Sequence, residues 1–386
     1  MRRGTFVKWG VPIAAAAVIG GALGAGPVIA AVSGDPALPA RSAQQLLADA
    51  VAAVEKTEGL PPMSGTVQQT ASLGLPALPQ TGASSPIALL SGSHEVKVWY
   101  GAKDKLRVAM PTHLNETNLI VNGGDAWYWD SADNTAVKIK MPAGGERPAD
   151  LVTPADLTPP AVAEKMLARA EEHTAVSVTS TAEVAGRPAY QLVLKPKAAG
   201  SLVQEVRLAI DGETYVPLRV QVYAKGSAEP AYQIGFTQLT FTPPAEENFV
   251  FTPPAGAKVE ERTLGVGQRQ ELIKEHAEDA KRTARDVKVV GEGWTTVAVL
   301  PASLEDLTGR PADGAARPER EPRSGADDGS GALVDSVLES ATQVSGPWGS
   351  GKLITTKLAT ALLTDDGRIL VGAVTPEEIV KAAGVR

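Results

Sequence analysis

The chain has no cysteine among its 386 residues. This absence excludes disulfides, thiolate metal sites, a cysteine nucleophile and an N-terminal lipidated cysteine. Histidine is also scarce, since the chain has four and none stands four positions from another. Scattered histidines are more typical of surface or packed side chains than of metal ligands. The sequence therefore predicts no metal site and no other cofactor.

Basic charge is in deficit, with 37 Lys and Arg residues against 44 Asp and Glu. The net charge of −7 argues against nucleic acid as a partner, because nucleic-acid-binding domains are usually basic. The chain also lacks a nucleophile elbow of the Gly-x-Ser-x-Gly type beside a suitable histidine and acid. Adjacent glutamates such as Glu246-Glu247 fall at predicted turns, where solvated charge explains them. The sequence therefore predicts that the protein is not an enzyme.

The N-terminus carries Arg2, Arg3 and Lys8 before a run, Gly10–Val32, without any charged or polar side chain. A basic flank, an apolar core and small residues near Ala30-Ala31 are typical of a secretory signal. The run is also long enough to span a bilayer, so a cleaved signal and a retained anchor both stay open. Either alternative places the rest of the chain outside the cytoplasmic membrane.

The segment 36–260 predicts one domain rich in strands. An apolar stripe at helical spacing predicts a helix that ends before Pro61-Pro62. A second helix, carrying Met166, is predicted after Pro159-Pro160. Short alternating segments divided by Gly, Pro and Asn turns predict about a dozen strands. The stripe consists of Ala43, Leu46, Leu47, Ala50, Val51 and Val54, and the strands include Ser64–Ala71, His94–Gly101, Lys105–Met110, Thr117–Gly123, Asp125–Ser131, Thr135–Met141, Leu202–Asp211 and Asn248–Pro254.

The predicted product is mainly β with helices (α+β): a curved antiparallel sheet, or incomplete β-barrel, with helices as a lid on its concave side. We expect five parts in the chain. They are a signal or anchor (1–35), the sheet domain (36–260), a helix and strand pair (261–303), a disordered linker (304–331) and a small α/β unit (332–386). Before the linker, Gln268–Val287 predicts a charged helix and Lys288–Leu300 a strand pair. In the last part, Ala332–Gln343 predicts a helix, and Asp366-Gly367 between two β-type runs predicts a hairpin. A loop, Leu73–Gly92, interrupts the first series of strands.

Aromatic residues are few, yet five of the twelve Trp and Tyr residues stand in two short stretches, Trp99-Tyr100 and Trp127–Trp129. In a strand, Trp127 and Trp129 share one face and Tyr128 takes the other. Two interpretations stay open for these side chains, namely an aromatic lining for an apolar ligand and ordinary packing in the sheet. The predicted lining of an apolar cavity consists of Trp99, Val108, Met110, Leu119, Val121, Trp127, Trp129, Val137, Ile139 and Met166.

One stretch, Gly346–Lys352, matches the spacing of a phosphate-binding loop, G-x-x-x-x-G-K. Its context differs, because a helix-like segment precedes it and Leu353 replaces the hydroxyl residue that would bind magnesium. We therefore predict no nucleotide site and expect the glycines to form a tight entry into a strand.

Three elements in the sheet domain resemble the extracytoplasmic lipoprotein-carrier family (LolA- and LppX-like) and the related N-terminal domain of RseB/MucB envelope-stress regulators. They are TNLIVNGGDAWYWDSADNTAVKI, then VAGRPAYQLVLKPK with VQEVRLAIDGETYVPLRVQVYA, and last FTQLTFTPPAEENFVFTPPAGAKV. The resemblance covers residues of about 41–260 and implies an incomplete barrel around an apolar cavity. One departure is that Lys103-Asp104 stands where the outer-membrane carriers have an Arg-Pro that helps to hold their lid closed.

The resemblance implies two alternative functions. The first is a non-enzymatic, extracytoplasmic binding protein that holds a lipid, an acylated protein or another apolar molecule in the concave face of the sheet. The second is a regulatory protein that senses the state of the envelope and binds an anti-sigma factor or a membrane transporter. The extra C-terminal unit favours the second alternative, because the simple carriers consist of the core alone.

Overall fold

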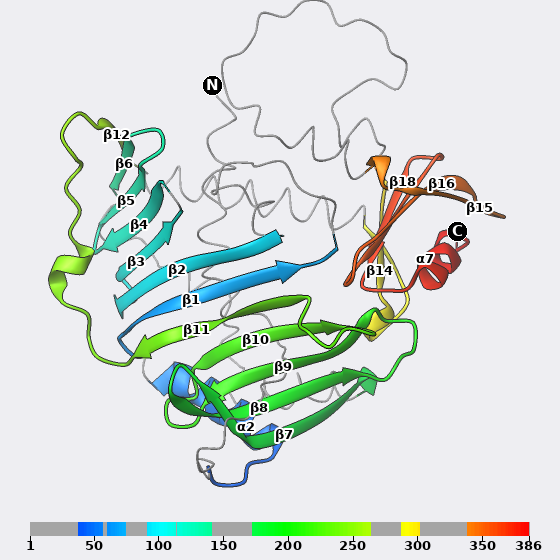
Figure 1. The fold of residues 1–386 in the computed structure, drawn as a ribbon, viewed down its shortest axis with the longest axis horizontal. Helices are drawn as coiled ribbons and strands as arrows, with labels where there is room; N and C mark the ends of the chain where they lie inside the picture. The colour runs from blue at the N-terminus through cyan, green and yellow to red at the C-terminus, as the bar shows by residue number, and fades with distance from the viewer. Residues whose placement is uncertain are drawn as a thin grey trace, which may run out of the picture.

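The computed structural model describes residues 38–56, 60–74, 91–112, 114–140, 172–263, 287–301 and 338–385. Within these residues the protein is mainly β, as predicted, and consists of a large and a small sheet (Figure 1). No helix in these ranges has the length and apolar character needed to cross a membrane. The predicted signal or anchor, the loop residues 75–90, the helix with Met166, residues 268–286 of the predicted charged helix and the linker lie outside the described ranges.

The large sheet has 12 strands in the order β12-β6-β5-β4-β3-β2-β1-β11-β10-β9-β8-β7. It is antiparallel except at one edge, where β12 pairs with β6 in parallel. The prediction of an antiparallel sheet is therefore wrong at that edge. The strands are β1 (Met63–Ser72), β2 (Ser91–Ala102), β3 (Lys105–Pro111), β4 (Glu116–Asn122), β5 (Asp125–Asp130), β6 (Thr135–Lys140), β7 (Thr174–Val184), β8 (Arg187–Pro196), β9 (Val203–Asp211), β10 (Pro217–Ala224), β11 (Tyr232–Thr240) and β12 (Lys258–Thr263).

The large sheet joins two meanders, β2–β6 and β7–β11, through β1. β1 pairs with β2 on one side and with β11 on the other, from Ser64↔Thr240 to Ala71↔Tyr232. The register shifts between Thr66 and Val67, which marks a bulge in this pair. The β1–β11 pair therefore forms a seam between two parts that are each built from neighbouring strands.

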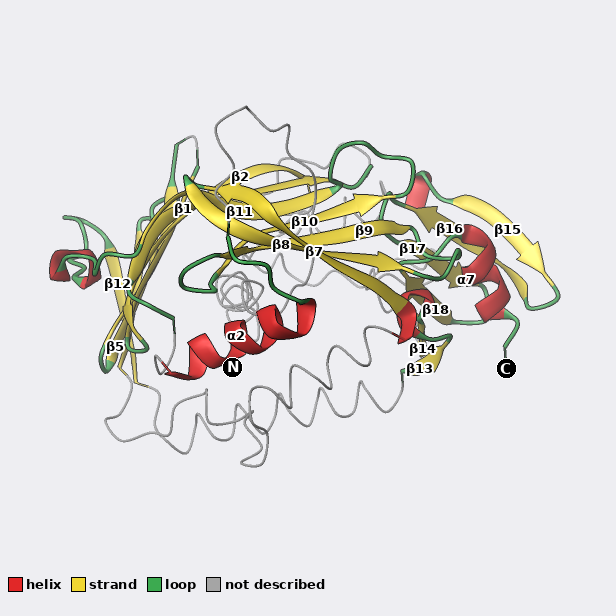
Figure 2. Ribbon diagram, turned by 90° about the horizontal axis from the view of Figure 1, so that it is seen from below, coloured by secondary structure: helices red, strands yellow, loops and turns green. Residues whose placement is uncertain are grey.

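Alternation along β9 shows why these residues form a two-sided sheet. Val206, Leu208 and Ile210 occupy every second position and are almost completely buried. They pack with Leu46 of α2 (Ala43–Lys56), which has no exposed surface. Figure 2 shows α2 beneath the arch of the sheet, so this face is the concave one. Both the face shared by these three residues and the predicted first helix are confirmed.

The start of α2 is fixed by a reciprocal cap. The Ser42 hydroxyl accepts a hydrogen bond from the Gln45 backbone N–H at 3.2 Å, and the Gln45 side-chain oxygen accepts one from the Ser42 N–H at 3.0 Å. This capping box satisfies two backbone donors that the first turn of a helix leaves free.

The turn between β9 and β10 is built around the Asp211 carboxylate, which has no exposed surface. One of its oxygens accepts hydrogen bonds from the backbone N–H and the hydroxyl of Thr214, at 2.7 and 2.8 Å. The other accepts one from Arg187 Nε of β8 at 2.5 Å. Burial alone would raise the pKa of Asp211, but the Arg187 and Thr214 hydrogen bonds outweigh it and leave the pKa below its ordinary value. The carboxylate therefore ties β8, β9 and the turn that follows β9 together as an anion.

After β11 the chain crosses the convex side of the sheet before it forms β12. The predicted strand Asn248–Pro254 is wrong, because Glu246–Phe249 forms a 3-10 helix (η4) and residues 250–257 pair with no strand. The side chains of Phe249 and Phe251 hold this segment against the sheet instead, because Phe249 is buried and Phe251 contacts Trp127 and Trp129. The last strand, β12, is highly charged, as is common for a strand at the edge of a sheet.

The small sheet has six antiparallel strands in the order β13-β14-β18-β17-β16-β15, with α7 (Pro376–Ala383) against one face. The predicted strand pair of residues 288–300 forms and belongs to this same sheet. The hairpin at Asp366-Gly367 is confirmed, whereas Thr342–Gln343, predicted to end a helix, begins β15. The strands are β13 (Lys288–Val290), β14 (Val297–Pro301), β15 (Thr342–Gly346), β16 (Gly349–Thr355), β17 (Thr360–Thr364) and β18 (Arg368–Gly372), with a 3-10 turn, η5 (Gly293–Thr295), between β13 and β14.

The two sheets are joined by backbone hydrogen bonds where β9 begins. Leu202 N–H donates to the Ala373 carbonyl at 2.9 Å, and Thr375 N–H donates to the Gly200 carbonyl at 2.8 Å. Ser201, completely buried, forms an isolated bridge with Val374. Because main-chain bonds on both sides of Ser201 span the junction, the small sheet is fixed to the end of the large one.

Candidate functional site

The concave face of β2–β6 carries a row of apolar side chains in register. Val98 lies opposite Val108, Val108 opposite Leu119, Leu119 opposite Tyr128, and Tyr128 opposite Val137. Partners in a ladder project from the same face of the sheet. Val98 belongs to a hydrophobic cluster against which Ile234 packs. Ile234 also packs against the cluster that contains Leu46 of α2, which we call the α2 cluster. The row therefore lies on the face of the sheet that carries α2.

A second row runs beside the first. Tyr100 lies opposite Leu106, Leu106 opposite Val121, Val121 opposite Ala126, and Ala126 opposite Ile139. Together the rows form an apolar surface across five strands, which we call the concave patch. It consists of Val98, Tyr100, Leu106, Val108, Leu119, Val121, Ala126, Tyr128, Val137 and Ile139.

The concave patch is electrically neutral in its interior. Burial raises the pKa of Tyr128 to about 12, with smaller contributions from the charges of Asp130 and Asp133. Burial likewise raises the pKa of Tyr100 above its ordinary value. Both phenols are therefore protonated at neutral pH, and the surface offers apolar contact with hydroxyl groups at two points.

One border of the concave patch is charged. Val137 lies opposite Glu260 and Ile139 opposite Arg262 on β12. Glu260 accepts hydrogen bonds from Lys258 at 2.8 Å and from Arg262 at 3.0 Å, which hold its pKa below the ordinary value. An apolar surface that ends in paired charges suits a ligand with an apolar body and a polar end.

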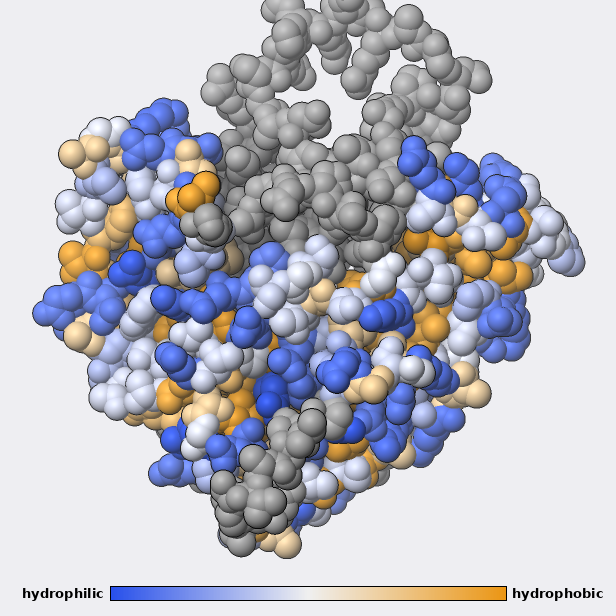
Figure 3. All heavy atoms as spheres, in the orientation of Figure 1, coloured by the Kyte–Doolittle hydropathy of each residue, from blue (hydrophilic) through white to orange (hydrophobic). Residues whose placement is uncertain are grey.

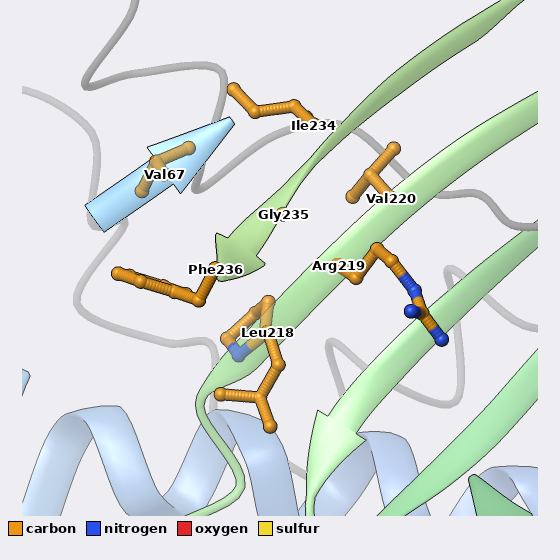
Figure 4. A pocket seen from close by; sticks show the side chains of 8 residues that line it. Val67, Leu218, Arg219, Val220, Ile234, Gly235 and Phe236 are labelled. Atoms are coloured by element: carbon orange, nitrogen blue, oxygen red, sulfur yellow. The ribbon is translucent and has the colours of Figure 1, made fainter. Parts of the chain in front are cut away.

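A small pocket lies between the concave patch and the α2 cluster. It encloses about 20 Å³, which is close to the space that one water molecule needs. Val67, Leu218 and Phe236 from three strands gather around it (Figure 4). Phe236 fills the space beside Gly65, where an added Cβ would lie 2.9 Å from the phenyl ring. This apolar corner continues the concave patch toward the centre of the arch.

Six of the residues predicted from the sequence to line a cavity lie on the concave face. Val108 and Val137 are buried there, while Leu119, Val121 and Ile139 are half-buried. Met110, opposite Thr117 in the ladder, is also half-buried and lies at the border of the patch. Met166 lies outside the described residues. A ligand-binding role for all of these residues stays a prediction.

The three predicted tryptophans project from the other face. Trp99 lies opposite Arg107, Arg107 opposite Ile120, and Ile120 opposite Trp127, and these positions alternate with the concave rows. Trp129 shares this convex face with Trp127, as predicted, and Tyr128 takes the other. The sequence fixes which residues share a face, but the structure assigns the tryptophans to the face away from α2.

On the convex face the tryptophans alternate with cations. The Arg107 guanidinium lies 5.2 Å from the Trp99 ring centre, and the Lys138 ammonium lies 5.3 Å from that of Trp127. Phe251 of the crossover packs at 5.4 Å from Trp127 and 5.9 Å from Trp129. Hydrophilic residues cover much of this side of the arch between smaller apolar patches (Figure 3). The convex aromatics are therefore engaged with partners from the protein itself.

Sequence reasoning missed several residues of the site. Tyr128 was not predicted as lining, although its ladder partners Leu119 and Val137 were. Phe236 and Leu218 were missed as well, because their strands belong to the β7–β11 meander and join the site only through the β1–β11 seam. Strand alternation was the available signal for Tyr128, once the concave face had been identified.

The glycine-rich stretch Gly346–Lys352 forms the hairpin of β15 and β16. A Cβ on Gly346 would lie 2.7 Å from Trp348 Nε1, and one on Gly351 would lie 2.3 Å from the Leu363 carbonyl oxygen. Close packing thus accounts for both glycines, and Lys352 is exposed on a strand. In the described part of the chain, no group of three or more His, Asp or Glu side chains is placed to hold a metal ion.

Comparison with known proteins agrees with the resemblance drawn from the sequence. Residues 82–260, less than half of the chain, match a family described as a predicted periplasmic protein of unknown function (DUF2092). No curated protein matches the chain.

Among solved structures, the MucA/MucB complex of Pseudomonas aeruginosa is similar at 14% identity, covering 88% of this chain and 96% of that chain with a TM-score of 0.42. A crystal structure of MucB is similar at 13% identity, with the same coverage and a TM-score of 0.37. A LolA superfamily protein from Nitrosomonas europaea is similar at 12% identity, covering 55% of this chain and 99% of that chain, with a TM-score of 0.21. These scores carry no conclusion about what this chain binds. The chain is similar in structure to MucB and to LolA-superfamily proteins, and its central part matches a family labelled periplasmic.

Proposed function

We propose that the protein is a non-enzymatic, extracytoplasmic binding protein that holds a lipid or acyl chain against the concave patch. The observation that carries the proposal is the register of two apolar rows across five strands on the side of the sheet that carries α2. The signal-like N-terminus and the periplasmic label of the matching family support a location outside the cytoplasmic membrane. No cofactor or nucleotide takes part in the proposed function.

The proposed binding mechanism is the removal of an acyl chain from water. Each methylene transferred from water contributes about 0.8 kcal/mol, so a chain lying across several strands has enough apolar area for useful affinity. The neutral phenols of Tyr100 and Tyr128 accept this contact without the cost of burying a charge. The paired charges of Lys258, Glu260 and Arg262 lie where a polar end would leave the patch.

The proposal is tested with the full chain and a dansylated undecanoic acid, whose fluorescence rises in apolar surroundings. We expect saturable binding and a loss of about tenfold in affinity for Leu119→Asn, because the amide places polar atoms under the chain. The matched control is Val259→Asn, which makes the same kind of change at an exposed position on the convex face. Absence of probe binding, or an equal loss in both variants, would contradict the proposal.

A second candidate function is a regulatory protein that binds the outer part of a membrane-bound anti-sigma factor or transporter. The small sheet favours it, since a complete second unit is fixed to the large sheet by main-chain bonds and lies apart from the concave patch. A photo-crosslinking residue at Gln343, exposed on edge strand β15, should capture a membrane protein in intact cells. The same residue at Glu95, exposed on the large sheet, is the control. Crosslinking from both positions alike would argue against a partner site on the small unit.

A further inference from the structure

The small unit contains a pocket of about 390 Å³. It lies between the end of α7, the β15–β16 turn, and the face of β13 and β14 toward the helix. This volume is within the range of about 300–1,000 Å³ that is typical of small-molecule sites. It is far larger than the 20 Å³ pocket of the concave face and lies in the other sheet.

One wall of this pocket is apolar and partly aromatic. Pro347 and Trp348 come from the hairpin turn, Val299 from β14, and Val385 follows α7. Val385 is 47% exposed, which is high for a large aliphatic side chain. The Trp348 indole lies against Gly346, and its buried N–H has no acceptor among the residues that the structure describes. A buried donor without a partner is unfavourable, so an acceptor brought by a ligand would improve this site.

The other wall is charged, and within the described ranges only one of its charges has no partner. Arg368 Nε donates to both oxygens of Asp366 at 3.0 Å, and Arg368 Nη1 donates to the Ala383 carbonyl at 3.0 Å. The hydrogen bond from Arg368 to the Ala383 carbonyl offsets the partial negative charge at the C-terminal end of α7. Lys288, in contrast, forms no ion pair or hydrogen bond with any described residue, and it is exposed at the pocket. The pocket therefore presents, beside an aromatic wall, one ammonium with which no described residue pairs.

We propose that this pocket binds a small organic anion with an apolar or aromatic body. Its carboxylate would pair with Lys288, and its body would pack on Trp348, Pro347 and Val299. The site differs from the concave patch in position and in chemistry, because the concave patch has a neutral interior. It thus goes beyond the proposed lipid-binding function and does not depend on it.

The proposal is tested by NMR titration of the full chain with 4-phenylbutyrate, using the neutral 4-phenylbutanol and the cationic 4-phenylbutylamine as matched probes. The indole N–H signal of Trp348 is assigned by its loss in Trp348→Phe. We expect 4-phenylbutyrate to shift this signal in a saturable way and to bind about tenfold more tightly than the amine, since a charge-assisted hydrogen bond contributes on this scale.

Lys288→Gln should weaken binding of 4-phenylbutyrate about tenfold and leave binding of 4-phenylbutanol unchanged. Lys352→Gln is the control, because it removes another exposed lysine of the same sheet that does not line the pocket. No shift at Trp348, equal binding of the anion and the amine, or equal losses in the two lysine variants would each overturn the proposal.

Discussion

The two meanders of the large sheet have the same strand alternation but are covered on opposite faces. In the β7–β11 meander, α2 covers the concave face, and Leu46 enters a cluster with Leu192 and Leu208. In the β2–β6 meander, the concave rows are met by no described helix, whereas the convex face is covered by the crossover through Phe251. The β7–β11 meander is thus closed on the concave side, and the β2–β6 meander is reinforced on the convex side.

This difference is the basis of a proposed division between support and binding. A core filled by a helix contributes mainly to stability, because its side chains are already surrounded by apolar partners. In the proposed function, the apolar face that no described helix covers binds the ligand, and the crossover holds its strands from behind. The four predictions below test that division, from the largest expected effect to the smallest.

The largest effect is expected at Leu46, the side chain through which α2 closes the β7–β11 meander. Leu46→Ala should lower the free energy of unfolding by about 3–4 kcal/mol, because it leaves a cavity in a well-packed cluster. Leu119→Ala, on the half-buried concave face of the β2–β6 meander, should lower the free energy of unfolding by about half as much. Both values are measured by urea unfolding. Equal losses would mean that the two concave faces are equally well packed, which would contradict the comparison.

A loss of about 3 kcal/mol is expected for Asp211→Asn, which leaves Arg187 without its buried anion. The pKa of Asp211 is lowered in the folded protein, so its stabilising contribution is complete above about pH 4 and disappears as the pH falls through the lowered value. The variant should therefore show a shallower loss of stability between about pH 4 and pH 2 than the wild type. Urea unfolding at a series of pH values measures this slope.

Glu213→Gln is the control for Asp211, because Glu213 also pairs with Arg187 but its side chain is 84% exposed. Exposed ion pairs contribute little, so its stability should change by less than about 1 kcal/mol. A shallower acid slope in Glu213→Gln than in Asp211→Asn would show that the buried carboxylate is not the group that titrates.

The crossover on the β2–β6 meander should contribute less to the free energy of unfolding. Phe251→Ala removes contacts with Trp127 and Trp129 and should cost about 1–1.5 kcal/mol. Val250→Ala, at a neighbouring exposed position, should change stability by less than about 0.5 kcal/mol. Tryptophan fluorescence during unfolding reports on both variants. If Phe251→Ala behaves like Val250→Ala, the crossover does not reinforce the convex face.

The smallest effect is expected at the junction of the two sheets. The Ser201 hydroxyl donates to the Ala373 carbonyl at 3.2 Å and accepts from the Val203 N–H at 3.1 Å. Ser201→Ala should cost about 1 kcal/mol and speed hydrogen exchange at the Leu202 and Thr375 amides, which span the junction. Ser345→Ala, at an exposed position of β15, is the control. Unchanged exchange at both amides would show that the hydroxyl does not hold the junction.

Much of the strand content could be predicted from the sequence, because alternation is a local property. Val206, Leu208 and Ile210 were placed on one face without any partner being known. The hairpin at Asp366-Gly367 followed from turn chemistry, and Gly367 has a φ of +84° that favours glycine. In both cases the decisive interactions lie within a few residues.

The choice of face could not be predicted in the same way. Trp127 and Tyr128 are adjacent and both aromatic, so local pattern gives no reason to assign either to the concave side. Only the ladder that links β5 through β1 to β11, and so to the α2 cluster, decides it. β12 escaped prediction for a related reason, since its charged sequence becomes a strand through pairing with distant β6.

The position of β1 has a consequence for the order of folding. β1 pairs with β2, which follows soon after it, and with β11, which lies more than 150 residues further along the chain. Each meander can form from short-range contacts, but joining them requires closure of this long loop, which is slow and entropically costly. A chain that emerges from its N-terminus would therefore present the free edge of β1 until β11 arrives. We expect this edge to be the point at which the newly synthesised protein is most prone to aggregate and most in need of a chaperone.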